Sequence, residues 1–200
     1  MSAKSKFGFS ICFQLSFWIT TTFYVACNLS DTCWCIYFVD HVVLRGFTGS
    51  DAIVFSTSAG VGKLLSKIIV GLLVDRDILK LRPALAILAT SCALCLITDP
   101  WMNSYWLVLV NVVIYCSFIA AIGALVDVYT RELIGTEFLA SAFSWMELVN
   151  GILTFCAGFI PGLIHDTIGN YDAAFIFMGC LFVLPLAALL VDCICLKRGA

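Results

Sequence analysis

Long apolar stretches, separated by short polar segments, run along the whole of this sequence. A bilayer core about 30 Å thick requires roughly 20 apolar residues in a helix, and six stretches reach or approach that length. They cover residues 12–38, 52–74, 82–98, 104–126, 138–163 and 173–196. The pattern predicts an all-α membrane protein with six transmembrane helices, which form a single membrane domain over residues 1–200.

The composition supports a membrane protein rather than a water-soluble one. Apolar residues make up 62% of the chain and charged residues only 12%, well outside the usual range of soluble globular proteins. The formal net charge of −2 shows no basic surface of the kind that binds nucleic acid. We therefore expect the lipid bilayer to be the main environment of the chain, and no nucleic acid among its partners.

No sequence pattern predicts a catalytic, metal or cofactor site. Most of the eleven cysteines lie within apolar stretches, where cysteine acts as a small hydrophobe, so few or no disulfides are expected. Cys92 and Cys95 form a C-x-x-C pair without a second pair or a histidine nearby. The two histidines, His41 and His165, lie in predicted loops. An enzyme is therefore not expected.

The basic residues predict the orientation of the chain, because cytoplasmic loops collect Lys and Arg. Eight of the eleven basic residues fall at the two ends and in the second and fourth loops, whereas Arg45 alone falls in the other loops. Both termini are thus predicted to be cytoplasmic. The eight are Lys4, Lys6, Arg76, Lys80, Arg82, Arg131, Lys197 and Arg198.

Lys63 and Lys67, the other two basic residues, lie within the second predicted span. Lys63 is roughly 16 Å from either end of that span at 1.5 Å per residue, too far for its ammonium to reach the membrane surface. Lys67 lies one turn later on the same face, about 11 Å from the cytoplasmic end of the span, so partial snorkelling is an alternative for it. Two neighbouring ammonium groups require a watery cavity, a carboxylate partner or an anionic ligand.

Further polar residues lie in the predicted spans, where such groups are functional candidates by default, among them Asp31, Glu147 and Asn150. Glu147 and Asn150 lie one turn apart in the fifth span. A carboxyl group at this depth is either neutral and hydrogen-bonded, paired with a lysine, or a proton carrier. Asp31 lies nearer the outer end of the first span, where a water-filled mouth is the simpler interpretation.

The segment after the second span carries a family signature. Gly71, Asp75 and Arg76, followed by Lys80, match the G-x-x-x-D-R-x-x-x-[KR] pattern and resemble the cytoplasmic loop of the major facilitator superfamily. Residues 158–171, with Ala174 and Phe175, resemble the D-x-x-G-x-Y loop region in the carboxyl-terminal half of monocarboxylate transporters. Residues 38–52 resemble the first loop of that same half.

This resemblance implies one half of a major facilitator superfamily fold, helices seven to twelve of a twelve-helix transporter. The chain is then a fragment, which we favour, or a half-length protein that pairs with a separate amino-terminal half. The eighth helix of the family carries an Asp and, four residues later, an Arg, implicated in proton coupling and in holding the substrate carboxylate. Counting back from Gly71 and Asp75 places Lys63 at the Asp position and Lys67 at the Arg position.

The predicted function is alternating-access transport of a small organic anion, a monocarboxylate by resemblance, with or without a proton. Lys63, Lys67 and Asn150 are the substrate-binding candidates, and Asp31 and Glu147 are the candidates for proton or ion coupling. The resemblance also implies a multi-pass protein of the plasma membrane and, as for some family members, a single-span accessory glycoprotein. A six-span channel or membrane scaffold subunit is the alternative.

Overall fold

The computed structural model describes residues 9–76 and 79–199, and the side chains of residues 11–74, 76 and 79–194. Within these ranges the chain is helical and contains no strand. The first four long helices are α1 (Leu15–Leu44), α2 (Gly49–Asp75), α3 (Leu81–Thr98) and α4 (Tyr105–Ile134). Two short 3-10 helices, η1 (Phe9–Phe13) and η2 (Asp99–Trp101), precede α1 and follow α3.

The fifth and sixth predicted spans are each divided into two helices. α5 (Leu139–Ala157) is followed by α6 (Ile160–Ile168), and α7 (Asp172–Leu181) by α8 (Val183–Gly199). The first break lies just before Pro161. Pro161 stands in the first turn of α6, where the fixed φ and missing N–H of proline suit the start of a helix. Gly169 then ends α6 in a left-handed conformation, with φ of 84°.

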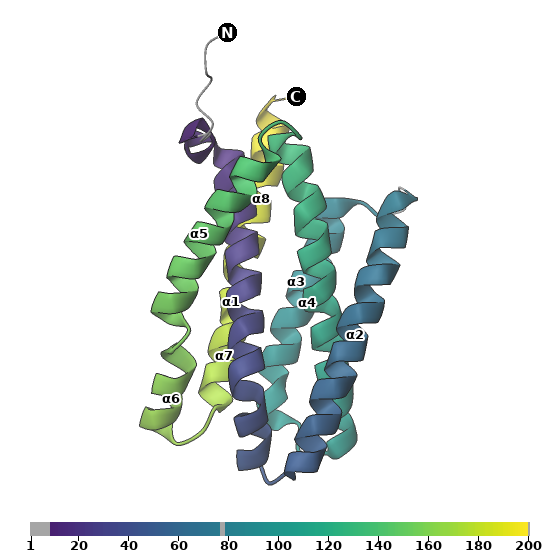
Figure 1. Cartoon of the computed structure of the whole chain (residues 1–200), viewed down its shortest axis with the longest axis vertical. Helices are drawn as coiled ribbons and strands as arrows, with labels where there is room; N and C mark the ends of the chain where they lie inside the picture. The colour runs from purple at the N-terminus through teal and green to yellow at the C-terminus, as the bar shows by residue number, and fades with distance from the viewer. Residues whose placement is uncertain (1–8, 77–78, 200) are drawn as a thin grey trace.

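The helical segments form a bundle with the form expected for one half of a major facilitator superfamily fold, as the sequence predicted (Figure 1). Among the described residues, five segments are long and apolar enough to cross a membrane: Gly49–Val74, Leu81–Trp101, Tyr105–Ile134, Leu139–Ile168 and Asp172–Ile194. α1 has the length, 30 residues, but polar residues such as Thr20, Asn28 and Asp31 lower its hydropathy.

α1 and α4 form the centre of the bundle. α1 contacts α4, α5 and α8, and α4 in turn contacts α2 and α3. Trp34 of α1 packs between Phe38, with ring centroids 4.4 Å apart, and Tyr115 of α4, at 5.8 Å. The core therefore lies on these two helices, and the remaining helices surround it.

α2 and the α5–α6 pair are the least covered parts of the bundle. Only 6% of the apolar window in Leu139–Ile168 and 17% of that in Gly49–Val74 is buried, against 50% for Tyr105–Ile134. Both segments contact the rest of the bundle along one side, so their remaining faces are open. The described ends of the chain lie together at one end of the bundle (Figure 1).

A charged cluster across four helices

An ion pair joins α1 to α2 in the middle of the bundle. Lys63 Nζ lies 2.5 Å from Asp31 Oδ1, and the two side chains are 25% and 34% exposed. The same ammonium lies 3.9 Å from Cys35 Sγ and 5.8 Å from the centre of the Trp34 ring. The carboxylate required by a lysine at this depth is thus Asp31, one of the three partners that the sequence left open.

Asp31 belongs to a polar stripe on α1. Tyr24, Asn28, Asp31 and Cys35 recur at the three- and four-residue spacing of one helix face, and none of the four is fully buried. Asn28 and Asp31 lie within a continuous helix, which they do not interrupt. The stripe places Tyr24 about 10 Å along α1 from Asp31, towards the end of the bundle that carries the termini.

Glu147 of α5 accepts a short hydrogen bond from the Tyr24 hydroxyl, which joins α5 to α1. The Glu147 carboxyl group is therefore hydrogen-bonded, and its role as a proton carrier stays a prediction. Asn150, the third substrate-binding candidate, lies on the next turn of α5, half-buried, and its Oδ1 accepts a hydrogen bond of 3.5 Å from Thr154.

Asp127 of α4 is an acidic residue that the sequence analysis missed. The predicted fourth span ended at residue 126, but α4 continues to Ile134 and carries Asp127 on an exposed face. The charges of Lys67 and Glu147 both act on this carboxylate. Lys67 is exposed, and no described carboxylate lies within 4 Å of its ammonium.

Together these residues form what we call the central cluster: Tyr24, Asp31, Lys63, Lys67, Asp127 and Glu147. It has two layers, with Asp31 and Lys63 in the first and the other four residues nearer the end with the termini. Each of α1, α2, α4 and α5 contributes at least one member. Such a cluster can bind an anion through its lysines and hold a proton on its carboxyl groups.

The predicted loop motif lies at the end of α2. Gly71 and Arg76 are exposed, and a Cβ on Gly71 would meet nothing within 4 Å. Arg76 is the C-terminal cap of the helix. The side chain of Asp75 lies outside the described residues, so the resemblance of the motif to the cytoplasmic loop of the superfamily rests on the sequence.

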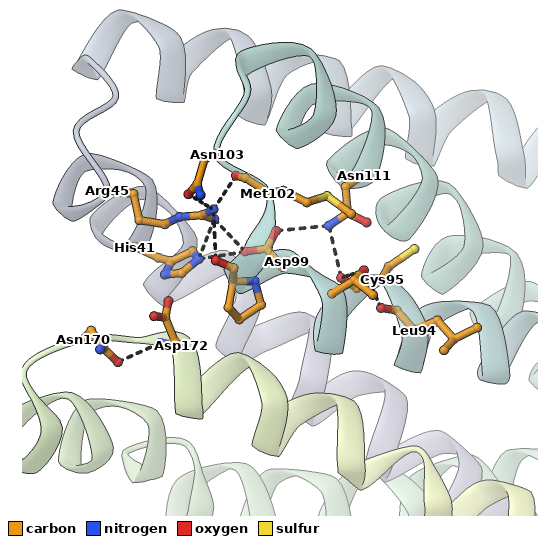
Figure 2. A network of polar contacts seen from close by, with 12 residues as sticks. His41, Arg45, Leu94, Cys95, Asp99, Met102, Asn103, Asn111, Asn170 and Asp172 are labelled. Atoms are coloured by element: carbon orange, nitrogen blue, oxygen red, sulfur yellow. Dashed lines mark hydrogen bonds and ion pairs between the residues drawn. The ribbon is translucent and has the colours of Figure 1, made fainter.

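A second polar network, at the end of the bundle opposite the termini, was also missed (Figure 2). Asp99, 3% exposed, accepts hydrogen bonds from His41 (2.7 Å), Arg45 (3.3 Å) and Asn111 (3.1 Å). His41 also stacks on Phe175 of α7, with ring centroids 4.1 Å apart. These contacts connect α1, α4 and α7 to the α3–α4 connection and satisfy a buried carboxylate.

The network corrects the expected position of the histidines. We expected both in loops, but His41 lies inside α1 and His165 inside α6. Burial of the polar His41 side chain is tolerated because it hydrogen-bonds Asp99, which also accepts hydrogen bonds from Arg45 and Asn111.

A third group of polar contacts joins α3, α4 and α8 near the end of the bundle that carries the termini. Arg82 Nε lies 2.6 Å from Asp192 of α8, and the Tyr129 hydroxyl donates to the same carboxylate oxygen at 2.7 Å. Asp192 lies inside the sixth predicted span, and its position there could have indicated that this carboxylate has polar partners. Among the described residues, no group of three or more His, Cys, Asp or Glu side chains is arranged to hold a metal ion.

No family model matches the chain. Similarity to individual proteins is detectable and consistent. The chain is 28% identical over 146 residues to monocarboxylate transporter 12 of Rattus norvegicus, covering 72% of this chain and 30% of that protein. It is 25% identical to the Mus musculus protein of the same name, over 89% of this chain and 37% of the relative. Monocarboxylate transporter 14 of Mus musculus is 26% identical over 64% of this chain and 25% of its own length.

The comparisons confirm the predicted resemblance to monocarboxylate transporters. The chain spans about a third of the length of the curated relatives it matches. These relatives are named as transporters and not as enzymes, channels or scaffolds, so they favour a multi-pass membrane transporter over the alternative classes.

Proposed function

We propose that this chain supplies half of a secondary transporter for small organic anions, most simply monocarboxylates. The observation that carries the proposal is the Lys63–Asp31 ion pair inside the bundle, with Lys67 exposed one turn further along the same face of α2. Two lysines at this depth require negative charge nearby, and Asp31 supplies it for one of them. A carboxylate substrate supplies it for the other.

The substrate carboxylate binds to Lys67 first and then competes with Asp31 for Lys63. A lysine presents a compact, hydrated charge without the bidentate fork of arginine, so it accepts carboxylates with little geometric selectivity. Exchange of one carboxylate for another keeps Lys63 paired, and the released Asp31 carboxylate then needs a proton to balance its charge. Asn150, one turn beyond Glu147, adds an amide that can hydrogen-bond a substrate oxygen.

The carboxyl groups of Glu147 and Asp127 are the proton-binding part of the site, with Asp31 as the third acid. Asp127 and Glu147 are exposed acids on the contacting helices α4 and α5, and the Tyr24 hydroxyl orients Glu147. The lysine at the position where the family has an acid leaves these residues as the acids that can couple a proton to the anion.

Transport proceeds by alternating access, with the central cluster facing a second six-helix half. The open faces of α2 and α5 support this arrangement, since both carry members of the cluster. In the complete transporter the termini are cytoplasmic, as the basic residues predict, and the protein resides in the plasma membrane. A single-span glycoprotein is the accessory partner by family resemblance.

Uptake measurements on a chimaera test the anion site. The chain is fused to the amino-terminal six-helix segment of monocarboxylate transporter 12, and uptake of radiolabelled pyruvate is measured as a function of concentration. Lys67→Gln should raise the half-saturating concentration roughly 10- to 100-fold, the equivalent of one charge-assisted hydrogen bond. Lys67→Arg keeps the charge and should leave the half-saturating concentration of pyruvate unchanged.

Glu137→Gln is the control, because it removes an exposed charge that lies outside both the cluster and the loop motif. Surface biotinylation corrects each uptake value for the amount of protein in the membrane. A Lys67→Gln chimaera that reaches the surface and takes up pyruvate with unchanged affinity would show that Lys67 only snorkels, and the anion-site proposal would lose its main support.

A further inference from the structure

An apolar groove runs along α2, α3 and α4, away from the central cluster. Its volume is about 500 Å³. Side chains from α2 and α3 form its two walls, and α4 forms its floor. The lining residues on the walls include Leu65, Ile69, Leu73, Ala84 and Ile87, and those on the floor include Val113, Phe118 and Leu125.

Close packing of α2 on α4 creates the groove. A Cβ on Gly62 would lie 2.7 Å from Ser117 Oγ, and the Ser66 hydroxyl donates to the Ser117 carbonyl at 2.5 Å. α3 packs against α4 as well, so the space between α2 and α3 is a trough above α4. The open side of the trough belongs to the apolar surface of the bundle, where lipid is the solvent.

The groove opens into a polar hollow at the end of the bundle that carries the termini. This hollow has a volume of about 390 Å³ and shares Leu79 with the groove. Each helix passes from groove to hollow within one turn, at Leu73 and Val74 on α2, Ala84 and Pro83 on α3, and Leu125 and Val128 on α4. The two spaces are therefore one continuous depression with an apolar part and a polar mouth.

The mouth carries charges of both signs. Lys80 and Arg82 line it together with Glu132 of α4. Arg82 is fixed by its ion pair of 2.6 Å with Asp192. Lys80 and Glu132 are exposed, and neither has an ion-pair partner within 4 Å among the side chains described. An ammonium and a carboxylate are thus available on the two sides of the same opening.

We propose that this depression is a binding site for a glycerophospholipid whose headgroup carries both a phosphate and a primary ammonium group. The phosphate binds to Lys80 beside Arg82, the ammonium donates to Glu132, and one acyl chain fills the groove. Charge complementarity argues for this occupant, since basic pockets between transmembrane helices bind phospholipid headgroups. A methylated choline headgroup has no N–H to donate and fits Glu132 less well.

Native mass spectrometry of the full purified chain tests the site. The chain is titrated in mild detergent with phosphatidylethanolamine and with phosphatidylcholine of the same acyl chains. Phosphatidylethanolamine should remain bound at concentrations roughly 10- to 100-fold lower than phosphatidylcholine. Glu132→Gln should remove this preference, whereas Lys80→Gln should weaken binding of both lipids, because both carry the phosphate. Ala84→Phe, which fills the groove below the mouth, should abolish binding of both lipids.

Two matched variants separate the site from general effects. Arg131→Gln removes an exposed charge that lies outside the mouth, and Ala140→Phe enlarges an exposed residue on α5, so both should bind as the unmodified chain does. Circular dichroism establishes that each variant keeps its helices. Equal retention of the two lipids by the unmodified chain, or an undiminished preference in Glu132→Gln, would overturn the proposal. Unchanged binding of both lipids by Lys80→Gln would also overturn it, as would specific capture of a second copy of the chain in place of lipid. None of these outcomes depends on pyruvate uptake.

Discussion

The ion pair between Lys63 and Asp31 links helix packing to the proposed anion site. Both side chains are about one third or less exposed, so separation of the pair leaves a charge that water reaches only in part. An isolated ammonium at mid-bundle is costly, whereas a pair in contact is tolerated. In the proposed mechanism an incoming carboxylate takes the place of Asp31, so that Lys63 stays paired.

A double-mutant cycle measures this pair. Lys63→Gln and Asp31→Asn should each lower stability by about 1–2 kcal/mol, less than for a fully buried pair because water screens these charges. The double variant should lose less than the sum of the two, with a coupling of about 1 kcal/mol. Thermal unfolding of the purified chain in detergent is the measurement. Lys67→Gln serves as the control and should change stability by less than about 0.5 kcal/mol.

Asp99 should be the most sensitive carboxylate of the described residues. It is buried and accepts hydrogen bonds from three side chains, so Asp99→Asn removes the charge that His41 and Arg45 share. We expect a loss of about 3 kcal/mol, visible as a lower midpoint in thermal unfolding. Asp40→Asn, at an exposed acid one residue from His41, should have little effect. Equal stability of the two variants would contradict the structural role of the network.

At the scale of helices, hydropathy predicts where the bilayer lies better than where a helix ends. α3 begins and ends within one residue of its prediction. α1 and α4 instead continue for six and eight residues beyond their predicted ends, because a helix satisfies its own backbone groups whether or not its side chains are apolar. Asp127 was missed for this reason.

The sequence identified several polar residues inside the bundle, but it did not identify the side chains that they contact. The lysines and Glu147 were identified from depth alone, but the identity of their partners depends on how the helices pack. Asp99 lies at a helix end beside Pro100, and such an Asp-Pro pair is typical of an exposed turn. Asp99 is instead buried by α1 and α7, which are distant in the sequence, so no neighbouring residue indicates its burial. The breaks after Ala157 and Leu181 likewise fall within continuous apolar stretches.

Gly62 provides a test of helix packing with a matched control on the same helix. An added Cβ at Gly62 would lie 2.7 Å from Ser117 Oγ and 3.3 Å from a carbonyl of α4, whereas Gly60 has open space. Gly62→Ala should lower stability by about 1–3 kcal/mol through overpacking. Gly60→Ala should be neutral or raise stability by up to about 1 kcal/mol through helix propensity. Thermal unfolding compares the two, and a stabilised Gly62→Ala would contradict the close approach of α2 and α4.

At the scale of the whole molecule, the arrangement of charges predicts its orientation in the membrane. Arg76, Lys80, Arg82 and Arg131 lie at the same end of the bundle as the described termini (Figure 1), and basic loops remain in the cytoplasm. A glycosylation acceptor in a Gly/Ser spacer after Asn170 should therefore be modified in cells, and the same insert after Thr136 should not. Modification of the Thr136 insert alone would invert the predicted orientation.

The open faces of α2 and α5 predict that the 200-residue chain does not transport by itself as a monomer. Lys67 and Glu147 lie on helices with little cover, and a site built between two halves excludes lipid and water only when both are present. Liposomes containing the purified chain should show no saturable pyruvate uptake, and co-reconstitution with a six-helix amino-terminal half should restore it. Lys67→Gln in the restored complex shows whether the uptake uses the central cluster. Saturable uptake by the chain as a monomer would contradict the two-half site, whereas uptake by a dimer would mean that a second copy supplies the other half.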